Sequence, residues 1–81
     1  MNEQDVYQAL NEIFSDIFDT PITLLPETTA KDIDGWDSLE HIHIIGVVER
    51  RFKIKFKMGE ISKMKNVGEM VSILMERGKL A

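Results

Sequence analysis

Residues 35–42 read Gly-Trp-Asp-Ser-Leu-Glu-His-Ile, and in this stretch a helix begins directly after a long irregular segment. Asp37 suits the N-cap, because its carboxylate can accept a hydrogen bond from a free N–H of the first turn. Glu40 follows three residues later and is expected to reach back to the cap in a capping box. A helix is therefore predicted over roughly residues 38–52, apolar around much of its circumference and the most buried helix of the chain. Its apolar positions are Leu39, Ile42, Ile44, Ile45, Val47, Val48 and Phe52.

The residues before this helix predict another amphipathic helix and a long loop. Asn2 is the expected N-cap of the first helix, and Pro21 is expected to end it after Phe18 or Asp19. Its apolar stripe is formed by Val6, Leu10, Ile13, Phe14 and Ile17. Residues 19–37 hold both prolines of the chain and have no periodicity, so they predict a loop, with Gly35 allowing a tight turn. Four apolar loop residues are expected to lie against the core: Ile22, Leu24, Leu25 and Ile33.

The residues after the helix predict an extended linker and two further helices. Residues 53–57 alternate Lys, Ile, Lys, Phe and Lys, but a lone strand has no partner in a helical chain, so an extended linker with Ile54 or Phe56 in the core is expected. Residues 59–64 suit a short third helix. A fourth begins at the cap Asn66, with Glu69 at the capping-box position, and stops at Gly78. Its core stripe is Val67, Met70, Val71, Leu74 and Met75.

Size and composition restrict the possible classes of protein. The 81 residues suit one domain, residues 1–81, and contain no cysteine that could form a disulfide or a thiolate metal site. No apolar run approaches the roughly 20 residues of a membrane span, and the polar, acidic N-terminus is unlike a secretory signal, so a cytoplasmic protein is expected. A water-excluding catalytic cleft is hard to build in so few residues. The expected fold is all-α, a four-helix bundle with three long helices, one short helix and a long first loop.

Charge is distributed unevenly along the chain, whose formal net charge is −4. Residues 1–49 hold eleven acidic residues and one basic residue, whereas residues 50–65 hold seven basic residues and one acidic residue. Such asymmetry bears on the choice of partners more than on the fold. A nucleic-acid partner is not expected, because the chain is acidic overall and the basic segment has little aromatic interleaving.

The chain resembles the acyl carrier protein family over nearly its whole length. The family's Asp-Ser-Leu triplet, at the start of the second helix after a long loop, matches Asp37-Ser38-Leu39. Further matches are the Glu27-Thr28-Thr29 stretch, Glu49 and Phe52 at the end of the helix, and Val67-Gly68-Glu69. Peptidyl carriers usually show Gly-Gly-His/Asp-Ser at the site, so Gly35-Trp36-Asp37-Ser38 looks more like the acyl type.

The resemblance implies a carrier that is not an enzyme. A phosphopantetheinyl transferase would move 4′-phosphopantetheine from coenzyme A onto Ser38, and acyl groups would then travel as thioesters between acyl-loading and acyl-transfer enzymes of a fatty-acid, polyketide or other specialised pathway. Asp37 would also help the transferase through its metal ion. Leu39 would be a core residue first and part of the recognition surface second. No membrane partner is implied, and a monomer suits a molecule that visits several enzymes.

The position of Ser38 fits this role on physical grounds. It lies in the first helical turn, where unpaired N–H groups and the helix dipole favour a phosphate. The alternative is that Asp37 and Ser38 only cap a helix in an unmodified interaction module. A hydrolase using Ser38 and His41 would also need an oriented base, an oxyanion site and a sheltered pocket. His41 and His43 are two residues apart on a helix and cannot share a metal.

Departures from the family pattern concern the partners. Typical fatty-acid carriers show acids along the second helix, whereas this helix also carries basic residues and Gly46 replaces a larger contact residue. A dedicated carrier with a partly acidic partner is therefore expected. The candidate recognition residues are Trp36, Glu40, His41, His43, Glu49, Arg50 and Arg51. Four methionines, expected at or near the core, either fill gaps or make an interior that opens for an acyl chain. They are Met58, Met64, Met70 and Met75.

Overall fold

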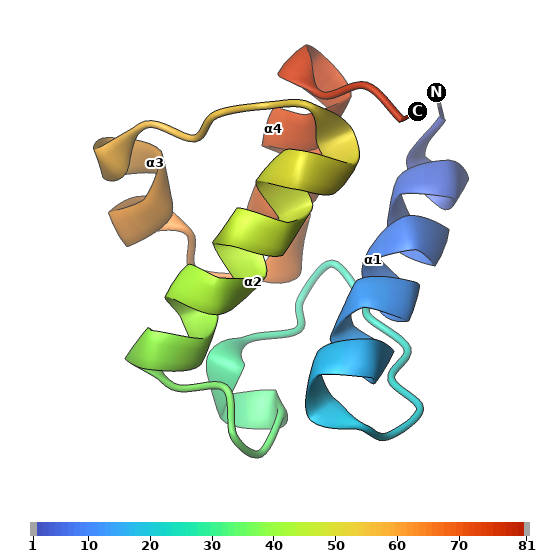
Figure 1. Ribbon diagram of the computed structural model, residues 1–81, viewed down its shortest axis with the longest axis vertical. Coiled ribbons are helices and arrows are strands. Elements are labelled where there is room, and N and C mark those ends of the chain that lie inside the picture. The colour runs from blue at the N-terminus through green and yellow to red at the C-terminus, as the bar shows by residue number, and fades with distance from the viewer. Residues whose placement is uncertain (1, 81) are drawn as a thin grey trace.

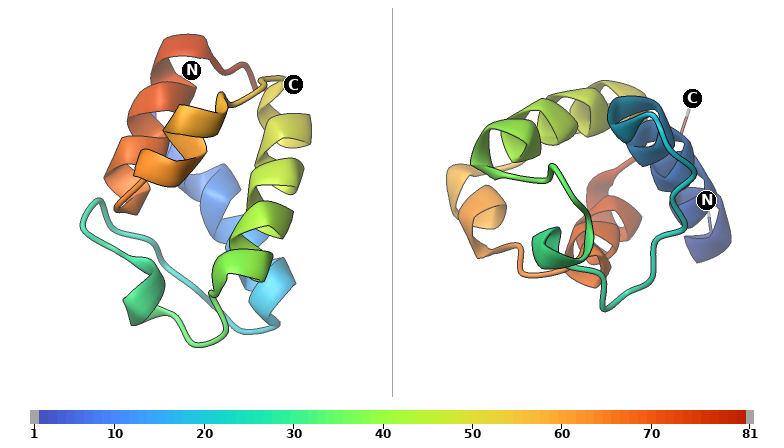
Figure 2. Two further views of the ribbon diagram at one scale, coloured as in Figure 1. Left: turned by 90° about the vertical axis from the view of Figure 1, so that its left-hand side faces the viewer. Right: turned by 90° about the horizontal axis from the view of Figure 1, so that it is seen from below.

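The computed structural model describes residues 2–80, which form the predicted all-α bundle (Figure 1). Within these residues there are four α-helices, one 3₁₀ turn and no strand. The elements are α1 (Glu3–Phe18), η1 (Ala30–Asp32), α2 (Ser38–Phe52), α3 (Met58–Lys63) and α4 (Val67–Arg77). The loop between α1 and α2 runs across one end of the bundle (Figure 2). No helix in the described part of the chain has the length and apolar character needed to cross a membrane.

Helix α1 begins and ends where its sequence predicts. The Asn2 side chain accepts a hydrogen bond from the Asp5 N–H at 2.8 Å, and the Asp5 carboxylate in turn accepts from the Asn2 N–H. Asp19 adopts a left-handed conformation with φ of 52° directly after the last helical residue. Such a residue reverses the chain and satisfies a helical carbonyl, so the helix ends at Phe18, three residues before Pro21.

The loop of residues 19–37 is fastened to the helices on both sides. Asn11 Oδ1 on α1 accepts a hydrogen bond from the Leu24 N–H at 2.8 Å. At the other side, the Thr28 carbonyl accepts from the Val67 N–H at 2.9 Å, at the start of α4. Leu24 is buried as predicted, but Leu25 is 52% exposed, so the prediction for Leu25 was wrong. Only one of the two leucines faces the core, because consecutive side chains of an extended segment point to opposite sides.

The core lies where α1 packs against α2 and α4. Its largest fully buried side chains are Phe14, Phe52, Leu10, Ile44, Met70 and Leu74. Each such side chain contributes about 1.5–3 kcal/mol through removal of apolar surface from water. The methionines divide: Met70 is buried, whereas Met58 is 84% exposed and Met75 is 40% exposed, so two of the four lie at the surface. The predicted stripe of α4 is otherwise confirmed.

Helix α2 is less buried than its composition predicts. Leu39 is 81% exposed and Ile42 is 60% exposed, and the residues buried in α2 begin only at Ile44. The prediction that Leu39 is mainly a core residue was therefore wrong. Residues 38–43 precede the first buried position of α2, and the element opposite them is α3, which has only six residues. By contrast, α1 has buried residues from Val6 to Phe14.

Residues 53–57 form the extended linker that the sequence predicts. Ile54 and Phe56 are both buried, each 8% exposed. The Glu49 carboxylate accepts a hydrogen bond from the Phe56 N–H at 2.8 Å, and the Glu49 carbonyl accepts from the Ile54 N–H at 3.1 Å. Two backbone N–H groups of the linker thus donate hydrogen bonds to α2 and not to a neighbouring strand.

The last two helices follow their predicted caps closely. Helix α3 begins one residue earlier than predicted. Asn66 caps α4 by accepting from the Glu69 N–H at 2.9 Å, but the Glu69 carboxylate accepts from the Lys65 N–H at 3.1 Å instead of closing a capping box. At Gly78 an added Cβ would lie 2.8 Å from the Leu74 carbonyl oxygen, so glycine permits this close approach.

Candidate functional site

Ser38 is the first residue of α2 and lies exposed at the end of the bundle. The cap is supplied by Asp37, whose carboxylate accepts a hydrogen bond from the Glu40 N–H at 2.8 Å. Gly35 makes the turn into this helix start with φ of +89°, a conformation that L side chains rarely adopt. Because Asp37 provides the cap, the hydroxyl of Ser38 is not needed for capping.

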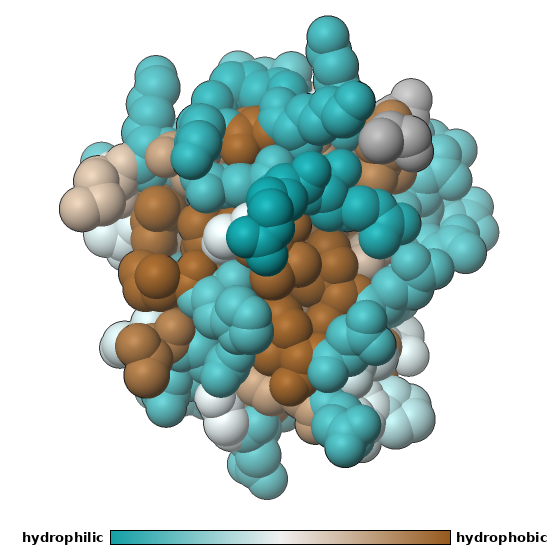
Figure 3. All heavy atoms as spheres, viewed as in Figure 1, coloured by the Kyte–Doolittle hydropathy of each residue, from teal (hydrophilic) through white to brown (hydrophobic). Residues whose placement is uncertain are grey.

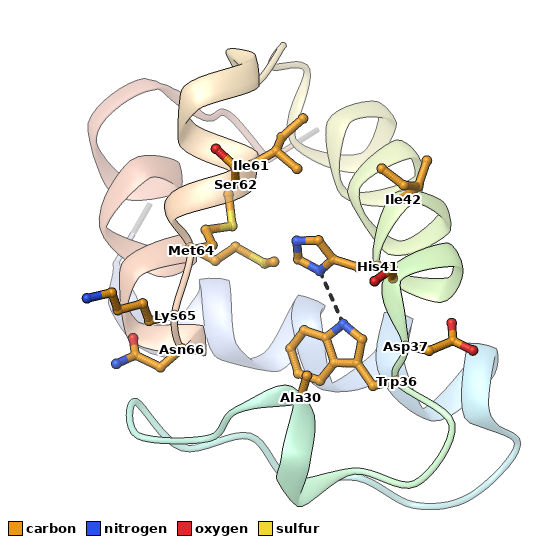
Figure 4. Close-up of a pocket in the computed structure, with 12 residues that line it drawn as sticks. Ala30, Trp36, Asp37, His41, Ile42, Ile61, Ser62, Met64, Lys65 and Asn66 are labelled. Carbon is orange, nitrogen blue, oxygen red and sulfur yellow. Dashed lines mark hydrogen bonds between the residues drawn. The ribbon is translucent and has the colours of Figure 1, made fainter.

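A pocket of about 470 Å³ lies beside Ser38, between α2 and α3 (Figure 4). Its lining is Ala30, Trp36, Asp37, Ser38, His41, Ile42, Ile61, Ser62, Met64, Lys65, Asn66 and Met70. Apolar side chains of α2, α3 and α4 contribute to it, with two of the methionines that were considered for a deformable interior. The pocket therefore joins the candidate attachment residue to the apolar inside of the bundle.

Trp36 forms one wall of the pocket and belongs to the core. It is 9% exposed, and its indole meets the Phe14 ring edge-on with 5.1 Å between the ring centroids. Its Nε1–H donates a hydrogen bond to Nδ1 of His41 at 3.1 Å. The predicted role of Trp36 in partner recognition has almost no exposed surface to act through, because this side chain points inward (Figure 4).

His41 is half-buried, and its hydrogen bond is with Trp36 and not with Ser38. Burial lowers the pKa of His41 below its ordinary value of 6.5, and a hydrogen bond with the Ile61 backbone acts in the opposite direction. The ring is therefore neutral near pH 7. A hydrolase would need this imidazole to take the Ser38 proton, but its Nδ1 already accepts from Trp36. The geometry gives no support to that alternative.

The other candidate recognition residues lie on the outer face of α2 and at its C-terminal end. The Glu40 carboxylate lies 2.7 Å from Nδ1 of His43. It contacts this ring and does not close the predicted capping box. Glu49 is occupied by the linker. Arg50 and Arg51 are exposed, and Arg51 lies 3.4 Å from the Glu12 carboxylate of α1. Ser38 and the two arginines are thus at opposite ends of the helix.

An exposed apolar surface next to Ser38 was missed by the sequence prediction. Leu39 and Ile42 lie three residues apart, on neighbouring turns of α2, and both are exposed. Figure 3 shows apolar side chains at the surface over the N-terminal half of α2 and toward α3. The position of Ile42 could have indicated part of this surface, because a residue four positions after an exposed helical residue shares its face.

Among the described residues, no group of three or more histidine or acidic side chains is arranged to hold a metal ion. The Asp37 carboxylate, which the resemblance links to a transferase's metal ion, stands exposed beside Ser38. It is therefore accessible to an enzyme that approaches the end of the bundle.

Comparison with known proteins finds a carrier protein with a similar structure. Neither the comparison with family models nor that with curated proteins found a match. The structure is similar to the solution NMR structure of a holo acyl carrier protein from Geobacter metallireducens, with a TM-score of 0.80 and 45% sequence identity. The similarity covers 86% of this chain and 82% of that one.

Proposed function

The chain belongs to the acyl carrier protein family, and from this premise we propose that it carries acyl groups on a 4′-phosphopantetheine arm attached to Ser38. Members of this family are carriers and not enzymes. The observation that carries the proposal is the exposed serine at the first position of α2, in the family's Asp-Ser-Leu context and directly beside an apolar pocket. When bound, the arm supplies a terminal thiol that holds acyl groups as thioesters.

The residues at the start of α2 fit a phosphodiester. The first N–H groups of a helix have no partner within the helix, and together with the dipole they favour an anion. Asp37 takes up only the Glu40 N–H. The N–H groups of the first helical positions therefore remain on the side where a phosphate on Ser38 would lie. Gly35 and the loop leave the hydroxyl open to a large modifying enzyme.

The pocket between α2 and α3 fits a role in sheltering cargo. Met64 and Met70 contribute flexible thioether side chains to its lining. Each methylene of an acyl chain that leaves water there gains about 0.8 kcal/mol. Such a gain is small enough for the cargo to leave again when a partner enzyme binds. A monomer that visits the transferase and several acyl-handling enzymes is consistent with this behaviour.

Two surfaces are proposed for partner recognition. Leu39 and Ile42 offer apolar contact next to Ser38, where any enzyme that reaches the arm must bind. From the other end of α2 along the linker to α3 runs a basic surface, defined by Arg50, Arg51, Lys53, Lys55 and Lys57. All five are exposed, and the three lysines point outward because Ile54 and Phe56 alternate with them and point into the core. A partly acidic partner in a specialised pathway fits this surface.

Intact-protein mass tests the attachment directly. The chain is incubated with coenzyme A and a broad-specificity phosphopantetheinyl transferase, as wild type and as Ser38→Ala. Ser62→Ala is the matched control, because Ser62 lines the same pocket from α3. We expect wild type and Ser62→Ala to gain one phosphopantetheine and Ser38→Ala to gain none. A folded wild-type chain that gains no mass from a transferase active on another carrier would contradict the proposal.

A further inference from the structure

The pocket beside Ser38 contains a hydrogen-bonded pair of side chains that a purely apolar cavity would lack. The His41 ring points from α2 into the cavity, with Trp36 beside it and Ile61 and Met64 on the α3 side (Figure 4). The indole Nε1–H donates to His41 Nδ1 at 3.1 Å, and the two rings lie nearly parallel with 5.9 Å between their centroids. Because Trp36 is held against Phe14 in the core, it holds the imidazole in one orientation.

This contact determines which ring nitrogen of His41 carries the proton. An N–H that donates to Nδ1 requires a lone pair there, so the neutral ring carries its proton on Nε2. Nε2–H is therefore the donor of a ring that faces Ile61 and Met64 across the pocket. His41 thus presents a hydrogen-bond donor to the space between α2 and α3.

A saturated acyl chain and an oxygenated one would meet this donor differently. Cargo that enters between α2 and α3 fills the space in front of the imidazole and excludes water from Nε2–H. An alkyl chain leaves Nε2–H without a partner in a half-buried place, which is unfavourable. A hydroxyl or keto oxygen on the cargo accepts from Nε2–H and supplies the partner that an alkyl chain lacks. Ser62 and Asn66 add polar groups to the same lining.

Resting on the proposed carrier function, we infer that the pocket prefers acyl groups that carry a hydrogen-bonding oxygen, and that His41 is the residue that determines this preference. Sites built to hydrogen-bond a group discriminate against analogues that lack it, because the protein's own polar group is then left unpaired. The cargo class is accordingly hydroxyacyl or ketoacyl, and not a plain saturated fatty acyl chain.

The test compares two cargoes of equal chain length on the full chain. Hexanoyl and 3-hydroxyhexanoyl phosphopantetheine are loaded from the corresponding coenzyme A thioesters, and loading is followed by mass. The methyl resonances of Met64 and Met70 report the ratio of pocket-bound to released cargo. We expect this ratio to be about tenfold higher for the hydroxylated cargo in wild type. His41→Leu should abolish the difference, and His41→Gln, which keeps a donor, should retain part of it.

His43→Leu is the matched control, because His43 is exposed, lies on another face of α2 and does not line this pocket. It should keep the wild-type preference. Equal ratios for the two cargoes in wild type, or a preference that persists in folded His41→Leu, would overturn the inference and leave the carrier function standing. If His41→Leu does not fold, the wild-type comparison still decides whether the preference exists, and a full wild-type preference in His41→Gln would overturn the role of His41. No mass gain on loading would overturn the attachment to Ser38, and with it the inference.

Discussion

The two histidines of α2 have different environments although only one residue separates them. His43 is exposed and pairs with Glu40 at 2.7 Å. His41 is half-buried and receives the indole hydrogen bond of Trp36. Successive helical positions are about 100° apart, so a two-residue step moves a side chain to another face. Only His41 is therefore coupled to the core, and its protonation state bears on the stability of the fold.

We predict that the free energy of unfolding falls as the pH drops from 7 toward 5. Burial lowers the pKa of His41 in the folded chain, so near pH 6.5 the unfolded chain binds more protons than the folded one. Stability is then full above the unfolded pKa, declines below it, and levels off below the folded pKa. Urea unfolding, followed by the fluorescence of Trp36, the single tryptophan of the chain, measures this.

His41→Gln should remove this decline, while His43→Gln should keep the wild-type profile. If His41→Gln shows the same slope as wild type between pH 7 and 5, the decline comes from other groups and the account given for His41 fails.

At the scale of elements, the junction between α2 and the linker depends on the Glu49 side chain. Lys53 adopts a left-handed conformation with φ of 54° and ends the helix. The Glu49 carboxylate then accepts the Phe56 N–H, and this contact holds the linker in register with Phe56 turned into the core. Glu49 was predicted to recognise a partner, but its carboxylate contributes to the fold. The position of a residue near the end of a helix does not show whether it binds a partner or stabilises the fold.

Replacing Glu49 should destabilise the fold more than replacing a surface ion-pair partner. Glu49→Ala leaves the Phe56 N–H without its acceptor, at a cost of about 1–3 kcal/mol. Glu12→Ala removes only the exposed pair with Arg51, which is worth about 0.2–1 kcal/mol at most. Urea unfolding of the two variants measures the difference. Glu49→Gln, which keeps an acceptor oxygen, should lie between Glu49→Ala and wild type, and equal losses for Glu49→Ala and Glu12→Ala would contradict the prediction.

At the scale of the whole molecule, the site and the basic surface occupy opposite ends of α2. Ser38, Leu39 and Ile42 lie at one end, and Arg50 and Arg51 lie at the other. A partner that reaches Ser38 and also contacts the basic surface must span most of the helix. Exposed charges act mainly on association rate and salt dependence, because water and ions screen them.

Reversing the charge of Arg50 and Arg51 should slow acyl transfer by the enzyme that loads this carrier. For Arg50→Glu combined with Arg51→Glu we expect a loss of a few-fold in kcat/KM, which diminishes as salt is added. Circular dichroism establishes that the fold is retained. Glu40→Lys is the control at the other end of α2. If Glu40→Lys slows transfer and the double arginine variant does not, the partner's face is basic and not acidic.

The sequence by itself determined the local structure of this protein. Asn2, Asp37 and Asn66 mark the starts of three helices because their side chains satisfy free N–H groups within the same turn, an interaction that needs no distant residue. Pro21 and Gly35 locate the loop for equally local reasons. Ser38 was identified as the candidate site by its triplet and its place at a helix start.

Only the tertiary structure decided which apolar residues are covered. Periodicity shows that Leu39 and Ile42 lie near one face of α2, but it cannot show that this face extends past the core and stays exposed. The prediction that Met75 belongs to the core stripe of α4 was wrong for the same reason. Conversely, Trp36 lies in an irregular segment without periodicity, and its burial depends on folding, which brings Phe14 of α1 against its ring. Burial and cavities arise from contacts between segments distant in sequence, so they follow from the packed chain and not from any local pattern.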